Sequence, residues 1–368
     1  MTTTPMKIEE LDTPVLLVDA AALERNLKAM GEIASAAGVA YRPHAKTHKS
    51  PIVANMQLEA GAVGVCCAKL GEAEIMAAAG IPDILITSQV VGRNKLVRLI
   101  QAAQDTNIMV VADNEDNISD LSSAAQTGGK PMDILIEVDV GQGRCGVPPG
   151  PEAARLARLI AETRWLRFRG LQGYQGLIQM TAGFDDRQAQ IQLAMEKLME
   201  TADHLKCASI EVEILTGGGS GSSIIDTALG GYTELQPGSY VFMDSRYRHV
   251  QWPGGAANPF ENSLTILGTV ISRPATDRAI VDVGYKAASS DGGPIVPVEN
   301  MDAKFSFAGD EHGQLFFPGG TCPLALGEKV EFLPSHCDTT VNLYDRYIVT
   351  RDGLVEDVWE IAARGRVQ

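Results

Sequence analysis

The 368-residue sequence contains no uninterrupted run of the roughly eighteen apolar residues that a membrane-spanning helix needs. Met1 to Pro14 also lack the basic and then apolar order of a signal peptide. Basic residues are scarce, because 31 lysines and arginines stand against 46 acidic residues, for a formal net charge of −15. A nucleic-acid partner would require a basic face. We therefore expect a cytoplasmic protein with no membrane or nucleic-acid partner, acting on a small molecule.

Cysteine is also sparse, and none of the six cysteines forms a CxxC pair. Most of them lie inside apolar segments, which favours reduced core thiols over a disulfide framework or a four-cysteine zinc site. At 368 residues, the chain is long enough for one large barrel or two ordinary domains, and 45% of its residues are hydrophobic. The sequence therefore indicates a globular protein with an ordinary apolar core.

Short apolar runs alternate with helical patterns in the first two thirds of the chain. The eight runs are residues 15–18, 39–41, 63–67, 84–87, 108–112, 134–140, 168–173 and 212–215. Apolar positions recur every three or four residues in the segments 21–37, 70–79, 93–104, 114–126, 151–163 and 185–204. Eight strand–helix units predict a (β/α)8 TIM-type barrel, whose chemistry lies at the C-terminal ends of its strands.

From about Gly254 onward the pattern changes to strands and turns. The predicted strands are residues 264–272, 278–283, 304–307, 329–333, 346–350 and 354–361. We expect a barrel domain over residues 1–250 and a smaller C-terminal all-β domain over residues 251–368. The first 13 residues or so can pair with the β domain instead.

Polar residues follow the predicted barrel strands where the chemistry of such a barrel lies. Lys46 follows the second strand, Arg144 the sixth and Tyr174 the seventh, and Gln172 lies near the end of the seventh. The glycine-rich run from Thr216 to Ser223, with Gly218, Gly219 and Ser220, follows the eighth. Taken alone, the lysine segment is typical of a solvated basic turn, and the glycine run is typical of a flexible turn. Together they predict a pyridoxal phosphate site, with a Schiff-base lysine, ring contacts and a backbone phosphate cradle.

Several longer motifs resemble one known family. They are Arg42 to Lys49 (RPHAKTHK), Cys67 to Glu74 (CAKLGEAE), Thr216 to Ser222, Gln236 to Tyr240 (QPGSY) and Pro334 to Leu343 (PSHCDTTVNL). They are similar to the D-threonine aldolase and D-serine dehydratase family, fold-type III pyridoxal phosphate enzymes related to alanine racemase. The resemblance extends from about Thr13 to Ile361 and implies a homodimer. It also implies that Lys46 holds the cofactor, which Arg144, Tyr174 and the glycine run contact. Gln175 departs from the family, because relatives often carry His there.

A second motif, His336-Cys337-Asp338, lies in the predicted β domain. In an extended segment, His336 and Asp338 share a face and can bind one metal ion, whereas Cys337 points away. A bulge that makes Cys337 a ligand is the alternative, and an isolated His-x-Asp is usually a surface turn. The resemblance implies zinc for the His-x-Cys of dehydratases and manganese or another hard ion for the His-x-Asp of aldolases. Carboxylate oxygen suits Mn²⁺, Mg²⁺ or Ca²⁺.

The resemblance and the His-x-Asp pair together favour one function. We expect a metal-dependent D-threonine aldolase, a lyase that cleaves a D-β-hydroxy-α-amino acid into glycine and an aldehyde. His44 and His312 are candidate acid–base groups, or structural histidines. Lys49 either meets a carboxylate or lies in solvent, and we favour solvent. A D-serine or D-3-hydroxyaspartate dehydratase is the main alternative. A non-enzymatic pyridoxal phosphate carrier and a racemase are further ones.

Overall fold

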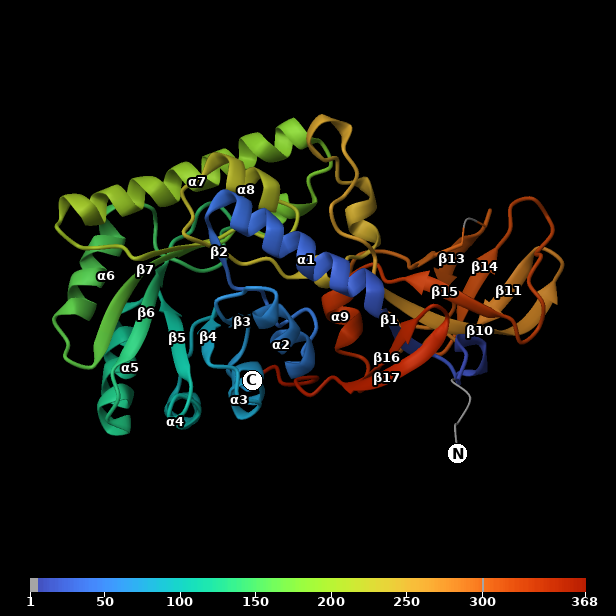
Figure 1. Ribbon diagram of the computed structural model, residues 1–368, viewed down its shortest axis with the longest axis horizontal. Helices are drawn as coiled ribbons and strands as arrows, with labels where there is room; N and C mark the ends of the chain where they lie inside the picture. Colours follow the sequence, from blue (N-terminus) through green and yellow to red (C-terminus); the bar gives the residue numbers. More distant parts are fainter. Residues whose placement is uncertain (1–5, 300) are drawn as a thin grey trace.

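The computed structural model describes residues 6–299 and 301–368. The chain forms a barrel-like unit and a β-rich unit side by side, with the long helix α1 (Ala20–Ala37) running between them (Figure 1). Over the described part of the chain, every helix is too short or too polar to cross a membrane.

Eight parallel strands form the first sheet. They are β2 (Ala40–Tyr41), β3 (Val65–Cys67), β4 (Asp83–Ile86), β5 (Asn107–Ala112), β6 (Met132–Glu137), β7 (Leu166–Gly173), β8 (Ile214–Gly217) and β9 (Glu234–Leu235). Their order is β2-β9-β8-β7-β6-β5-β4-β3. A parallel bridge between His44 and Cys66 joins the two edge strands. The expected barrel is therefore confirmed.

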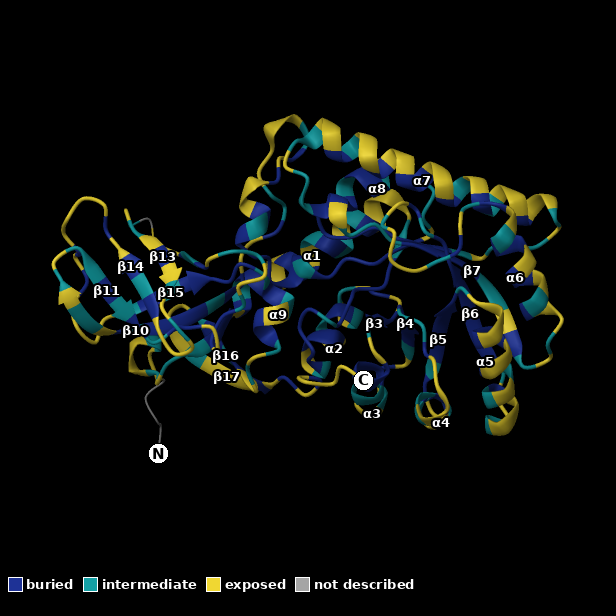
Figure 2. Cartoon of the chain, turned by 180° about the vertical axis from the view of Figure 1, so that it is seen from behind, coloured by how far each residue is buried: buried dark blue, intermediate teal, exposed yellow. Residues whose placement is uncertain are grey.

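Alternation along these strands divides the apolar side chains between two cores. One small cluster contains Cys66, Leu85, Met109, Val111 and Leu135. Their neighbours in sequence belong instead to the cluster that includes the surrounding helices. These helices are α2 (Pro51–Glu59), α3 (Leu70–Ala78), α4 (Arg93–Ala102), α5 (Glu115–Gly128), α6 (Pro151–Ala161), α7 (Phe184–Cys207) and α8 (Ser223–Leu229). Figure 2 shows exposed outer faces on α5 and α7 and largely buried strands.

The second sheet has nine strands. They are β1 (Val15–Asp19), β10 (Leu264–Ala275), β11 (Arg278–Val281), β12 (Val296–Pro297), β13 (Lys304–Phe307), β14 (Gly313–Phe316), β15 (Lys329–Leu333), β16 (Arg346–Arg351) and β17 (Leu354–Glu360). A short helix, α9 (Cys337–Val341), lies between β15 and β16. The sheet forms the expected β-rich unit that follows the barrel.

The strand β1 corrects one detail of the sequence prediction. Residues 15–18 were expected as the first barrel strand, but β1 pairs antiparallel with β10 and parallel with β16 in the second sheet. The eighth barrel strand is β9, which contains only Glu234 and Leu235. The helix α1 then leads the chain into the barrel, and the Asp19 side chain caps this helix by accepting the backbone N–H of Ala22 at 2.9 Å.

Candidate active site

Lys46 lies in a tight turn directly after β2. The backbone N–H of His44 donates to the Pro237 carbonyl at 2.9 Å, and that of Lys49 donates to the Ala45 carbonyl at 2.7 Å. These bonds fix the turn, and Lys46 lines a cavity of about 210 Å³. Its side chain is 37% exposed. The sequence-predicted lysine therefore faces open space at one end of the barrel.

The other lysine and the arginine of the basic stretch form buried ion pairs. Arg42 pairs with Glu234 of β9 at 2.9 Å, and Lys49 pairs with Glu72 of α3. Lys49 is only 6% exposed, so its expected position in solvent is wrong. An unpaired buried charge would be costly, and these carboxylates neutralise both groups. Lys46 is therefore the cation of this stretch that reaches the cavity.

His44 supports the turn through both of its ring nitrogens. Nδ1 is 3.4 Å from the backbone N–H of Lys46, and Nε2 is 3.0 Å from Thr87 Oγ1. Burial, and then the positive charge of Lys46, lowers the pKa of His44 well below its usual value. The imidazole is therefore neutral, and its first role is to hold the backbone of Lys46.

Three of the residues predicted to contact the cofactor ring lie around Lys46. The ring of Tyr174 lies 6.0 Å from Lys46 Nζ and 5.6 Å from the guanidinium carbon of Arg144. Both residues line the same cavity. Gln172 is buried behind them, where its Nε2 donates to the Thr87 carbonyl at 3.3 Å. The loop after β6 and the end of β7 thus meet the Lys46 turn.

The glycine-rich loop follows β8, which is the seventh barrel strand because β9 is the eighth. Gly219 and Ser220 line the cavity, whereas Thr216 and Gly218 lie outside its lining. Thr216 is buried, and its hydroxyl donates to Glu234 at 3.5 Å. The loop therefore presents its middle residues to the same space as Lys46.

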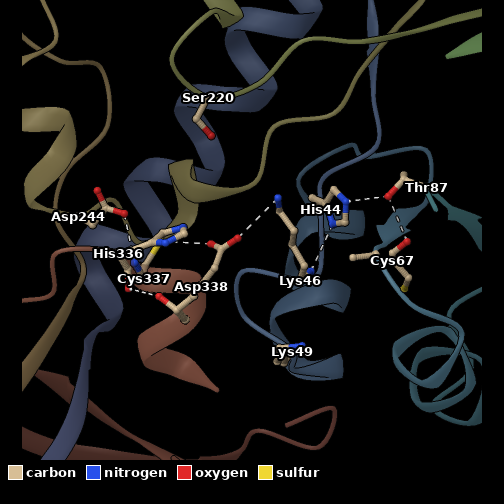
Figure 3. A network of polar contacts seen from close by, with 12 residues as sticks. His44, Lys46, Lys49, Cys67, Thr87, Ser220, Asp244, His336, Cys337 and Asp338 are labelled. Atoms are coloured by element: carbon tan, nitrogen blue, oxygen red, sulfur yellow. Dashed lines mark hydrogen bonds and ion pairs between the residues drawn. The ribbon is translucent and has the colours of Figure 1, made fainter. Parts of the chain in front are cut away.

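His336 and Asp338 reach the cavity through a helix start rather than a strand. His336 has extended dihedral angles (φ −147°, ψ 117°) and is the N-cap of α9, so Asp338 lies in the first turn. Asp338 Oδ2 is 3.7 Å from Lys46 Nζ. Figure 3 shows the two side chains pointing toward each other. Burial alone would raise the pKa of Asp338, but Lys46 and His336 lower it.

Cys337, between them, is fully buried and does not line the cavity. Burial raises the pKa of its thiol well above the usual value, which disfavours the thiolate that a metal requires. Its backbone N–H donates to Asp244 Oδ2 at 3.1 Å. The extended conformation and the bulged alternative are therefore both wrong, because the chain turns into α9 at this residue.

Asp291 is a site residue that sequence reasoning missed. Its Oδ2 lies 2.6 Å from His336 Nδ1, although the two residues are 45 positions apart. Burial opposes ionisation of Asp291, yet hydrogen bonds from His336, Ser289 and Thr339 lower its pKa to about 2. The carboxylate of Asp291 thus keeps the imidazole proton on Nδ1, and Nε2 keeps the lone pair that a metal ion can bind.

Two further groups lie apart from this cavity. His312 is exposed in the connection between β13 and β14 and does not line the cavity of this chain. Asp113, Glu137 and Cys145 bring potential metal ligands within 4.8 Å of one another. However, Gln89 Nε2 donates to Asp113 at 3.0 Å and to Glu137 at 2.6 Å. Both carboxylates of that cluster therefore have a hydrogen-bond partner without an ion.

Comparison with known proteins places the chain in a class. Residues 18–246 match the family model of the alanine racemase N-terminal domain, and residues 263–350 match a putative serine dehydratase domain. The barrel with its cavity-facing lysine is therefore that of an alanine racemase-like enzyme, a class that depends on pyridoxal phosphate.

Comparison with individual relatives identifies the family within that class. A D-threonine aldolase from an Arthrobacter species is 43% identical over 97% of this chain and 94% of the relative. A 3-hydroxy-D-aspartate aldolase from Paracoccus denitrificans is 39% identical over 98% and 94%. The crystal structure of D-threonine aldolase from Filomicrobium marinum has a TM-score of 0.96 at 39% identity and covers 100% of both chains. The chain belongs to the D-threonine aldolase family, whose members are lyases, which confirms the resemblance found in the sequence.

Dehydratases are more distant relatives. The D-threo-3-hydroxyaspartate dehydratase from Delftia sp. HT23 is 27% identical, with a TM-score of 0.85 over 96% of this chain and 98% of that one. A cysteine-to-alanine mutant of that dehydratase has been solved in a metal-free form.

The residues of the cavity fit pyridoxal phosphate. An amine, an aromatic ring and a guanidinium share one space, and a loop of glycine and serine residues borders it. At Gly221, an added Cβ would lie 2.1 Å from the Gln179 carbonyl oxygen, so only glycine fits this packing. The cavity also offers the imidazole of His336 and the carboxylate of Asp338, the nitrogen and oxygen donors that a hard divalent ion accepts.

Proposed function

We propose that this protein is a pyridoxal phosphate- and divalent-metal-dependent D-threonine aldolase, which cleaves D-β-hydroxy-α-amino acids into glycine and an aldehyde. One observation carries the proposal. Lys46 of the barrel and Asp338 of α9 lie 3.7 Å apart (Nζ to Oδ2) in one cavity. A substrate whose amino group lies at the lysine can therefore place its β-hydroxyl at the metal pair.

Lys46 is proposed as the Schiff-base residue, and Gly219 and Ser220 as part of the phosphate cradle. When bound, pyridoxal phosphate supplies an electron sink for the charge left when the Cα–Cβ bond breaks. Arg144 and Tyr174 border the space of the ring, and Gln172, Thr216 and Gly218 support that space from the strands. We propose that Lys46 Nζ then donates a proton to Cα, which gives glycine.

His336 Nε2 and Asp338 are proposed to hold Mn²⁺, with Mg²⁺ or Ca²⁺ as alternatives. Such an ion lowers the pKa of a hydroxyl that it contacts. Asp291 supports this role, because metal-ligating histidines commonly donate their second ring N–H to a carboxylate. His44 lines the cavity, but both of its ring nitrogens already have hydrogen-bond partners, which makes it a weak acid–base candidate. His312 would need a partner subunit to reach the cavity.

A dehydratase that gives a 2-oxo acid and ammonia is the second candidate function, with zinc as its metal. The buried Cys337 disfavours it, because no thiolate faces the cavity beside His336. A non-enzymatic pyridoxal phosphate carrier would have no use for the carboxylate-oriented imidazole opposite the lysine.

The decisive experiment supplies D-threonine, D-phenylserine, D-3-hydroxyaspartate and D-serine to the purified protein, with and without EDTA. Glycine and 2-oxo acid are quantified in each reaction. We expect glycine with an aldehyde, and loss of turnover in EDTA that Mn²⁺ restores. Release of pyruvate or oxaloacetate without glycine would refute the aldolase proposal, and turnover indifferent to EDTA would remove the metal from it.

A homodimer in the cytoplasm is proposed as the working state. The β-rich unit exposes several apolar side chains that a second copy can cover, including Ile271, Tyr285, Val298 and Phe316. All six cysteines are free thiols, as a reducing compartment allows. Light scattering coupled to gel filtration gives the mass directly, and a monomer at micromolar concentration would refute the dimer. Fractionation of the source cells tests the location.

A further inference from the structure

The cavity contains more positive charge than the cofactor chemistry uses. Its lining includes the cations Lys46, Arg144 and Arg246 but one carboxylate, Asp338. Lys46 lies 3.7 Å from that carboxylate, and Arg144 lies 3.8 Å from Glu137. Within the described residues, Arg246 forms no ion pair, although it lines the same space.

The one carboxylate close to Arg246 in sequence is already occupied. Asp244 is buried, and its two oxygens accept the backbone N–H groups of Cys337 and Arg246, each at 3.1 Å. Asp244 and Arg246 attract each other electrostatically, but within the described residues the guanidinium of Arg246 donates no hydrogen bond, so it is available to an anion that enters the cavity. Its half-buried position makes a charge-assisted hydrogen bond there stronger than one in open solvent.

The stem of Arg246 lies on the metal-pair side of the cavity. It belongs to the short 3-10 helix η4 (Ser245–His249), and its Cδ packs over Gly292, where an added Cβ would come within 2.9 Å. The same Cβ would lie 2.6 Å from the carbonyl oxygen of Ser335, the residue before His336. Arg246 therefore lies on the side of the cavity that His336 and Asp338 line, where the proposed function puts the β-hydroxyl and its β-substituent.

We propose that Arg246 is a specificity-determining residue that binds a carboxylate on the β-carbon of the substrate. This inference rests on the proposed function for its substrate orientation. It predicts that the protein favours acidic β-substituents, as in D-3-hydroxyaspartate, over the methyl group of D-threonine. A guanidinium can hold such a carboxylate through two parallel N–H···O bonds, which a methyl group cannot accept.

The test compares two ligands that lack the β-hydroxyl and cannot be cleaved to glycine. D-Aspartate and D-2-aminobutyrate are titrated into the pyridoxal phosphate-loaded protein, and binding is followed by the visible absorbance of the cofactor. The wild-type protein should prefer D-aspartate. Arg246→Gln should reduce that preference about 10- to 100-fold, the effect of losing a charge-assisted hydrogen bond, and Arg246→Lys should retain part of it.

Arg248→Gln is the matched control, because Arg248 lies on the same helix but is exposed and outside this cavity. Its preference should equal that of the wild type. An equal loss of affinity for both ligands in Arg246→Gln, or an unchanged ratio, would overturn the inference. The ratio of the affinities for D-aspartate and D-2-aminobutyrate tests the role of Arg246 even if the wild-type protein releases no glycine. The absence of glycine would refute only the proposed function.

Discussion

Asp226 lies beneath the glycine-rich loop and provides a sharp test of the site. It is 2% exposed on α8, and Ser222 donates its hydroxyl proton to Asp226 Oδ2 at 2.5 Å. Ser222 in turn accepts the backbone N–H of Gly219 at 3.0 Å. Burial raises the pKa of Asp226 to about 7, although Ser222 lowers it. A buried carboxylate that is partly charged at neutral pH thus supports the proposed phosphate cradle.

This pKa implies a pH-dependent stability. An aspartate in the unfolded chain has a pKa of about 3.9, so between about pH 4 and pH 7 the folded state keeps a proton that the unfolded state has released. The free energy of unfolding therefore falls as the pH rises through this window. At about 1.4 kcal/mol per pH unit, Asp226 costs at most about 4 kcal/mol above pH 7 and almost nothing below pH 4.

Asp226→Asn removes this titration while keeping the size and the acceptor oxygen. The free energies of unfolding of the variant and the wild type should agree within about 1 kcal/mol near pH 4.5. The variant should then become steadily more stable than the wild type up to about pH 7. Urea denaturation of the cofactor-free protein at several pH values measures the difference in the free energy of unfolding between variant and wild type. The contributions of the other titrating groups are the same in both proteins and cancel in this difference. Asp203→Asn, at an exposed position of α7, controls for the loss of one charge. A difference that does not change with pH would refute the reasoning.

Three further predictions concern the cofactor and the metal. Lys46→Ala should abolish borohydride-dependent covalent labelling by pyridoxal phosphate, and labelling that persists would contradict the assignment. Asp291→Asn should weaken Mn²⁺ binding about 10- to 100-fold by calorimetry, because the orientation of His336 is lost; unchanged affinity would exclude that role. Gly221→Val should raise the dissociation constant for pyridoxal phosphate in a fluorescence titration, since its Cβ would meet the Gln179 carbonyl, and wild-type affinity would show that the loop adapts.

The sequence predicted the barrel well but assigned one strand to the wrong sheet. The segment 15–18 is a short apolar run, and such a run is equally suited to a barrel strand and to a buried strand of another sheet. Only pairing with β10 and β16, some 250 and 330 residues later, decides between them. The true eighth strand, β9, has two residues and is too short to leave a periodic signal.

The site shows the same division between local and distant information. Lys46, Tyr174 and the glycine-rich loop could be placed at one end of the barrel from the sequence, because each follows a short apolar run. The motif at 336–338 was recognised, but its conformation was not, because five residues of helix give no usable period. Asp291 and Arg246 carry no motif. Asp291 lies in an irregular segment and Arg246 in the short 3-10 helix η4, and tertiary packing alone brings both to the site.

The misplaced strand also explains how the two halves of the site come together. β16, which directly follows α9, pairs with β1, and Tyr347 of β16 donates its hydroxyl to the His48 carbonyl in the Lys46 turn at 2.6 Å. The chain thus begins in the β-rich unit, builds the barrel and returns beside its own start, so Asp338 is held against Lys46. The barrel supplies the cofactor residues and α9 supplies the donors that we propose for the metal. On the proposed function, a substitution at the start of α9 would change the metal donors while leaving the cofactor residues of the barrel in place, which is consistent with aldolases and dehydratases sharing this fold.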